Sequence, residues 1–161
     1  MFREATDDDM VRLRDLERAA NEAALAHVFP PDRYPFPADD VLARWALVLA
    51  DPGAVTLVLD HQWKESLVAY ATYDDHALRH LAVHPDYWGE GLATAAIEAA
   101  LHAMDLRGST SATLWCLKAN HRARRLYDFL GWRMTGERRP APWPPHPVEV
   151  EYARLIVASD R

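Results

Sequence analysis

The chain has 161 residues, half of them hydrophobic and 26% charged, and its formal net charge is −6. These values predict one globular domain over residues 1–161, and no apolar run approaches the ~20 residues that a membrane-spanning helix needs. The single cysteine, Cys116, excludes an internal disulfide and a cysteine-rich zinc site, and the acidic balance argues against a nucleic-acid partner.

Hydrophobic spacing, together with helix and turn signals, predicts the element order β-α-α-β-β-β-α-β-α-β-β. This order is typical of a mixed α/β fold in which a single sheet carries helices on its faces. The expected strands span residues 2–5, 54–59, 67–73, 77–83, 113–117, 132–137 and 148–155, and the expected helices span residues 6–27, 39–50, 92–104 and 120–130.

Nine of the 11 prolines lie in two loops, at residues 30–37 and 140–147. Proline fixes φ and cannot donate to a β-ladder, so both loops should be stiff and irregular. They are either plain connectors or, because they carry aromatic residues, the walls of a pocket. We expect a substrate pocket here, and the candidate substrate-binding residues are Phe29, Tyr34, Phe36, Tyr73 and Trp143.

The charge is unevenly distributed, because residues 118–139 hold seven basic and two acidic residues in an otherwise acidic chain. Such a segment is either a solvated helix face or an anion site. Gly89 and Gly91 favour the anion site, since they stand where a strand gives way to a helix whose free N–H groups and dipole can bind phosphate. The loop is not a Walker A loop, and it lacks the third glycine of a dinucleotide fingerprint.

A second motif begins at Asn120, which shares one helical face with Ala123 and Tyr127 at spacings of three and seven residues. The helix ends at Gly131, and Trp132 follows. Together with the Leu-x-Val-x-Pro strand end at 81–85 and the Gly-x-Gly turn, this motif resembles the GNAT superfamily of acyl-CoA-dependent N-acetyltransferases. The element order also resembles that fold, which has a central, mostly antiparallel, twisted sheet flanked by about four helices.

The resemblance implies that acetyl-CoA is the cofactor. Backbone amides of residues 88–93 would bind its pyrophosphate, the strand near Leu81 would pair with the pantetheine arm, and Tyr127 would protonate the leaving thiolate. The chain departs from the family at Trp88, where Arg or Gln is usual. The implied cofactor-binding residues are Leu81, Ala82, Val83, Trp88, Gly89, Glu90, Gly91, Leu92, Ala93, Thr94, Asn120, Arg122, Arg125 and Tyr127.

Acyl transfer to nitrogen requires a neutral amine, and neutralising a lysine-like amine at pH 7 costs ~4–5 kcal/mol. A base or a desolvating pocket must supply this free energy. His80 is the first candidate base, followed by His76, His84 and Glu151. A metal site on the three histidines is rejected, because four residues of a strand span ~13 Å. Cys116 is expected to be a small buried hydrophobe.

The expected function is therefore direct transfer of an acetyl group to a primary amine, with Tyr127 as general acid. An acidic chain favours a small cationic acceptor. Two alternatives remain open: the acceptor is a peptide or protein amine, or the chain is a non-catalytic acyl-CoA-binding module. The acidic N-terminus is unlike a signal peptide, so we expect a cytoplasmic protein, either a monomer or a homodimer.

Overall fold

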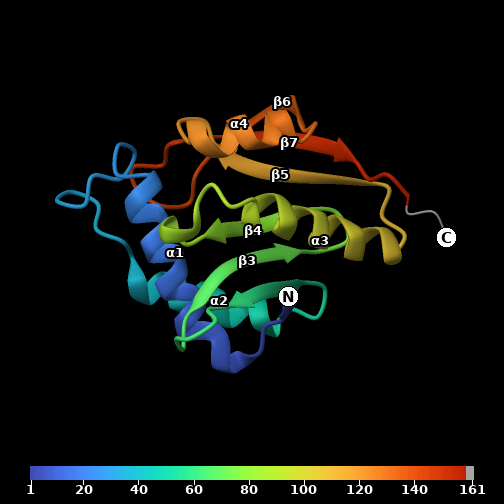
Figure 1. The fold of residues 1–161 in the computed structure, drawn as a ribbon. Coiled ribbons are helices and arrows are strands. Elements are labelled where there is room, and N and C mark those ends of the chain that lie inside the picture. The colour runs from blue at the N-terminus through green and yellow to red at the C-terminus, as the bar shows by residue number, and fades with distance from the viewer. Residues whose placement is uncertain (159–161) are drawn as a thin grey trace.

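Seven strands and four α-helices follow one another in the predicted order in residues 1–158, the part of the chain that this computed structural model describes (Figure 1). Two single-turn 3₁₀-helices, η1 (Asp7–Asp9) and η2 (Pro85–Tyr87), accompany them. The strands are β1 (Arg3–Glu4), β2 (Val55–Asp60), β3 (Leu67–Tyr73), β4 (Leu78–Val83), β5 (Ser111–Leu117), β6 (Arg133–Pro140) and β7 (Val148–Leu155), and the helices are α1 (Met10–Ala24), α2 (Ala38–Ala50), α3 (Leu92–Leu106) and α4 (His121–Phe129).

The first helix is shorter than the sequence predicts, because α1 ends at Ala24 instead of near His27. The amides of Val28 and Phe29 both donate to the carbonyl of Leu25, which turns the chain into the first proline-rich loop. The residue before a proline is disfavoured in the α-helical region, so the helix cannot continue to Pro30.

The strands form two antiparallel sheets, with orders β1-β2-β3-β4 and β5-β7-β6. The sequence predicts one mixed sheet, and the structure divides it between β4 and β5. A single parallel bridge, from Ala77 to Thr113, joins the two sheets at the start of β4. The mixed α/β class is confirmed, and its parallel component is reduced to this bridge.

Helices cover both faces of the first sheet, and all seven residues of β3 are buried as a result. On one face, α1 and α2 pack around Trp45, which is fully buried against Tyr70. On the other face, the alanine-rich side of α3 packs on β3 and on the second sheet. This arrangement fixes the N-terminus of α3 next to the end of β4.

The C-terminal end of α4 is set by Gly131, whose φ of 86° only glycine adopts without strain. The amide of Trp132 donates back to the carbonyl of Tyr127, and the Trp132 ring is buried in the core beside the Tyr127 ring. The glycine therefore fixes the orientation of Tyr127 on the helix. In the described part of the chain, no helix has the length and apolar character that crossing a membrane requires.

Candidate active site

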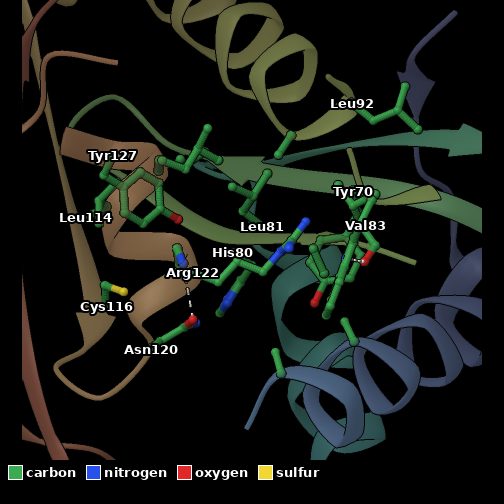
Figure 2. A pocket seen from close by; sticks show the side chains of 18 of the residues that line it. Tyr70, His80, Leu81, Val83, Leu92, Leu114, Cys116, Asn120, Arg122 and Tyr127 are labelled. Carbon is green, nitrogen blue, oxygen red and sulfur yellow. Dashed lines mark hydrogen bonds between the residues drawn. The ribbon is translucent and has the colours of Figure 1, made fainter. Parts of the chain in front are cut away.

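A cleft of about 620 Å³ lies where β4 and β5 separate (Figure 2). Residues 79–83 of β4 form one wall, and residues 114–116 of β5 form the other. Because β4 pairs with β3 on one side only, the edge of β4 that faces the cleft keeps backbone N–H and C=O groups for a ligand. The mouth of α3, one face of α4 and one face of α1 complete the lining.

The N-terminus of α3 opens onto the cleft without a side-chain cap. Its N-cap is Gly91, with φ of 79°, and Gly89 has φ of 82°. A Cβ at either position would meet no atom within 4 Å, so these glycines are required for backbone conformation and not for lack of space. The first-turn amides of residues 92–94 have no partner within an α-helix, and together with the helix dipole they form an anion site.

Arg122 supplies a positive charge beside this helix mouth. Its guanidinium lies 4.0 Å from the centre of the Trp88 ring, and the indole nitrogen of Trp88 donates to the carbonyl of Val83 over 2.8 Å. The Trp88 ring is thereby fixed at the end of β4 as a platform for the arginine, an arrangement typical of a cation–π pair. Arg79 and Arg125 also line the cleft, whose lining includes one acidic residue, Glu17.

Asn120 and Tyr127 lie in the same wall of the cleft, on α4 and its N-cap. The Asn120 side-chain oxygen caps the helix by accepting from the amide of Ala123, which leaves its NH₂ group for a ligand. Tyr127 is buried between Trp132 and Tyr152, and its hydroxyl points toward the middle of the cleft (Figure 2). Burial raises the pKa of Tyr127 above its ordinary value, so this hydroxyl carries its proton at physiological pH.

His80 and Cys116 line the cleft but are poorly suited to proton transfer or nucleophilic attack. Burial, assisted by the charges of Arg44 and Arg79, lowers the pKa of His80 to about 3. Burial raises the pKa of the Cys116 thiol to about 12, so the thiolate is not populated at neutral pH. Cys116 is buried against the core, in agreement with its predicted packing role.

A second cavity of about 320 Å³, which we call the aromatic cavity, lies between the two proline-rich loops. Glu17 and Asn21, one turn apart on α1, line both this cavity and the cleft. The lining of the aromatic cavity has three acidic residues and one basic residue, whereas the cleft has three arginines and one glutamate. Its aromatic lining residues are Phe29, Tyr34, Phe36 and Trp143.

The structure brings most of the predicted site residues together. Every residue predicted to bind cofactor lines the cleft except Glu90, which is exposed beside it. Four of the five candidate substrate-binding residues line the aromatic cavity, and Tyr73 is the exception. Tyr73 is three residues from Tyr70 along β3 and so lies on the opposite face of the sheet, buried in the core with Arg107 over its ring.

The other candidate bases lie outside the cleft. His76, His84 and Glu151 are absent from its lining. The His84 ring accepts from the amide of Asp86, and Glu151 accepts from the hydroxyl of Thr135 on the second sheet. In the described residues, no group of three histidine, cysteine or acidic side chains could hold a metal ion.

Sequence reasoning missed the polar group at the junction of the two cavities. Glu17 accepts hydrogen bonds from Arg44 and from the hydroxyl of Tyr70, and its side chain is 9% exposed. Burial and the nearby Glu17 charge raise the pKa of Tyr70 well above its usual value, so its hydroxyl stays a donor. The sequence held one signal for this role, which is the position of Glu17 on its helix. It shares the buried face of α1 with Leu13, Leu16 and Ala20, and an acidic residue is rare on such a face.

Residues 12–132 match the model of the acetyltransferase (GNAT) family, which is more than half of the chain. The chain belongs to this family. It is therefore an acetyltransferase enzyme, and its cofactor is acetyl-CoA. No curated protein sequence matches the chain.

Solved structures with the same fold include a GCN5-related N-acetyltransferase from Rhodopseudomonas palustris, with a TM-score of 0.81, 21% identity, and 96% of this chain and 94% of that chain covered. The ribosomal-protein-S18-alanine N-acetyltransferase from Escherichia coli has a TM-score of 0.72 and 21% identity, with 100% and 97% covered. An aminoglycoside 6′-N-acetyltransferase complexed with coenzyme A has a TM-score of 0.68 and 14% identity, with 100% and 99% covered. At these identities the likeness shows the fold alone.

The cleft of this acetyltransferase has the chemistry that acetyl-CoA requires. An uncapped helix N-terminus with Arg122 and Arg125 suits the phosphates, whereas Arg79 is paired with Asp51. The free edge of β4 suits an extended chain that carries amides. The apolar inner wall around Leu114 and Cys116 suits a thioester. The donor and acceptor groups on the cleft therefore fit the cofactor of the family.

Proposed function

We propose that this acetyltransferase transfers the acetyl group of acetyl-CoA to the primary amine of a small cationic molecule, with Tyr127 as the general acid. The observation that carries the proposal is the shared wall at Glu17 and Asn21, where the aromatic cavity meets the cleft. A volume of about 320 Å³ lies in the range of small-molecule sites and is bounded by two stiff loops. An excess of acidic lining residues favours a cation.

On this proposal the cofactor occupies the cleft and the acceptor occupies the aromatic cavity. The first-turn amides of α3, with Gly89 and Gly91 before them, hold the pyrophosphate, and the edge of β4 from Leu81 to Val83 holds the pantetheine arm. Arg122 takes over the charge that Trp88 lacks, because the ring supports its guanidinium beside the helix mouth. Bound acetyl-CoA supplies the acetyl thioester, whose carbon–sulfur bond is replaced by an amide bond.

Tyr127 donates its hydroxyl proton to the sulfur that leaves the acetyl group. The raised pKa of Tyr127 keeps that proton in place until the sulfur gains electron density. Trp132 and Tyr152 hold the ring, so the hydroxyl needs little reorganisation. General-acid assistance of this kind contributes roughly 10²–10⁴-fold to a rate.

His80 is not assigned the role of base. With a pKa of about 3, it is too weak to hold the proton of an amine whose pKa is ~10.4. Moving a proton from the amine to His80 across this difference of seven pKa units would cost ~10 kcal/mol. Binding the minor neutral form of the amine costs far less. His80 therefore forms part of the wall. The acceptor, bound as an ammonium, releases one proton to water at the junction and reacts as the neutral amine, whose second proton replaces the one that Tyr127 gives to the sulfur.

The test is thiol release from acetyl-CoA in the presence of small primary amines and, separately, of peptides with a free N-terminal or lysine amine. Turnover with small amines and not with peptides supports the proposal. Turnover only with peptides would assign a protein acceptor, and tight binding of acetyl-CoA with no turnover on either panel would assign a binding module. Thiol release without amine is the control for hydrolysis.

A further inference from the structure

Glu17 occupies the junction that an acceptor must reach for acetyl transfer. Glu17 and Asn21 are the only described residues that line both cavities, and they stand one above the other on α1. A molecule whose body lies in the aromatic cavity can present a nitrogen to the cleft only beside these two side chains. The reacting amine of the proposed function is therefore adjacent to a carboxylate and an amide.

The Glu17 carboxylate is held in one orientation from one side. Both of its hydrogen bonds, from the Arg44 guanidinium and from the Tyr70 hydroxyl 3.2 Å away, end on Oε1. Within the described residues no hydrogen bond reaches Oε2, although the side chain is only 9% exposed. Oε2 is not among the buried polar atoms that lack a partner, so it is accessible at the junction, and a ligand can replace water as its donor.

Arg44 positions Glu17 without entering either cavity. Its guanidinium stacks on the Trp45 ring at 5.0 Å and does not belong to either lining. The ion pair orients the carboxylate, and the aromatic platform keeps the arginine in place. Glu17 thus presents a fixed oxygen at the junction.

The aromatic cavity itself indicates what lies behind the amine. Guanidinium groups already stand over two of its four rings, Arg33 over Tyr34 at 5.8 Å and Arg18 over Phe36 at 5.4 Å. In the described chain no cation stacks on Phe29 or on Trp143. These two rings and the prolines form an apolar surface, which suits the hydrocarbon or aromatic body of a ligand with one positive charge.

We propose that Glu17 binds the ammonium group of the acceptor through Oε2, and that the acceptor is a primary amine on a short apolar or aromatic body. Arg44 and Tyr70 act as positioning residues for this carboxylate. The inference rests on the proposed function, because it names the residue and the substrate class of the same site. On this proposal the enzyme selects its acceptor by positive charge as well as by shape.

The test compares 2-phenylethylamine with 2-phenylethanol, which has the same body and no charge. Dissociation constants are measured by calorimetry on the protein saturated with coenzyme A. The wild type should prefer the amine by about 10- to 100-fold, as expected for a charge-assisted hydrogen bond in a desolvated site. In Glu17→Gln, which keeps the shape and an acceptor oxygen for Tyr70, this preference should fall to about two-fold or less.

Two further variants separate this role from loss of structure. Glu98→Gln removes a carboxylate that pairs with Arg154 outside both cavities and should leave the preference unchanged. Glu22→Gln removes an acid that lines the aromatic cavity alone, so an equal loss there would overturn the assignment to Glu17. Coenzyme A affinity within two-fold of wild type shows that the Glu17 variant is folded.

Each remaining outcome is decisive. An undiminished preference for the amine in folded Glu17→Gln would overturn the inference while leaving acetyl transfer intact. Failure of the wild type to bind either probe would overturn the acceptor class. Failure of the proposed function is a separate result, since it would appear as absent thiol release with every amine while Glu17→Gln still changed amine binding.

Discussion

Replacing Tyr127 by Phe removes one hydroxyl oxygen from the cleft and nothing else. This hydroxyl forms no hydrogen bond with the described part of the chain, and the ring keeps its contacts with Trp132 and Tyr152. No buried partner loses a hydrogen bond, so the free energy of unfolding should change by less than ~1 kcal/mol. The variant therefore tests chemistry with little change in structure.

The turnover number of Tyr127→Phe should fall at least ten-fold, and by up to roughly 10⁴-fold if protonation of the sulfur limits the wild-type rate. Each factor of ten corresponds to ~1.4 kcal/mol of transition-state stabilisation. The assay is thiol release at saturating amine, with coenzyme A affinity measured in parallel and expected to stay within two- to three-fold of wild type.

Tyr152→Phe is the matched control. It also deletes a buried tyrosine hydroxyl, which accepts a hydrogen bond from Arg124 over 3.0 Å, but Tyr152 does not line the cleft. This control should lose ~1 kcal/mol of stability and keep its turnover number. Unchanged turnover in folded Tyr127→Phe, or equal losses in the two variants, would refute the role of Tyr127 as general acid.

Three other predictions follow from the cleft. Gly91→Ala must adopt a φ near 79° with a Cβ, so we expect a stability loss of ~1–2 kcal/mol in urea unfolding and weaker coenzyme A binding by calorimetry; unchanged values in both would contradict the role of this turn. Arg122→Gln should weaken coenzyme A binding about ten-fold or more, and Trp88→Leu by a smaller factor of about two to five. The double variant should bind coenzyme A no more weakly than Arg122→Gln alone. If the losses of affinity in the two single variants added up in the double variant, the ring would not act by supporting the arginine. Burial lowers the pKa of His80 from 6.5 to about 3, so the unfolded chain binds this proton first and native stability should fall as the pH drops from 6.5 toward 3. His80→Gln should lose less stability over that range in urea titrations, and an identical pH dependence would contradict the shift.

Much of the candidate site was predictable because its determinants are local. A glycine with positive φ, an Asx cap and a proline that ends a strand act within a few residues, so Gly91, Asn120 and Gly131 mark helix ends in the sequence as clearly as in the structure. The spacing from Asn120 to Tyr127 similarly places both on one face of α4. The two proline-rich loops were predicted as walls of a pocket, and they do line the aromatic cavity.

Three features could not be predicted in this way, because they depend on contacts between distant segments. The sheet divides between β4 and β5, which are far apart in sequence and share only the bridge at Ala77 and Thr113. The Trp88–Arg122 pair joins a turn to a helix 34 residues later. Tyr73 is a residue predicted to bind substrate that instead packs in the core, because an aromatic residue at a strand end can face either side of the sheet.

The sequence by itself determined the order of elements, the helix mouth that can hold an anion and the residues of α4 that face a ligand. Periodicity, capping and glycine conformation are properties of neighbouring residues, so they can be read without the fold. Only the tertiary structure decided that Glu17 stands between the two cavities and that basic residues line one while acidic residues predominate in the other. The role of a charged residue depends on the groups packed around it, and for Glu17 those groups come from α1, α2, β3 and the two loops.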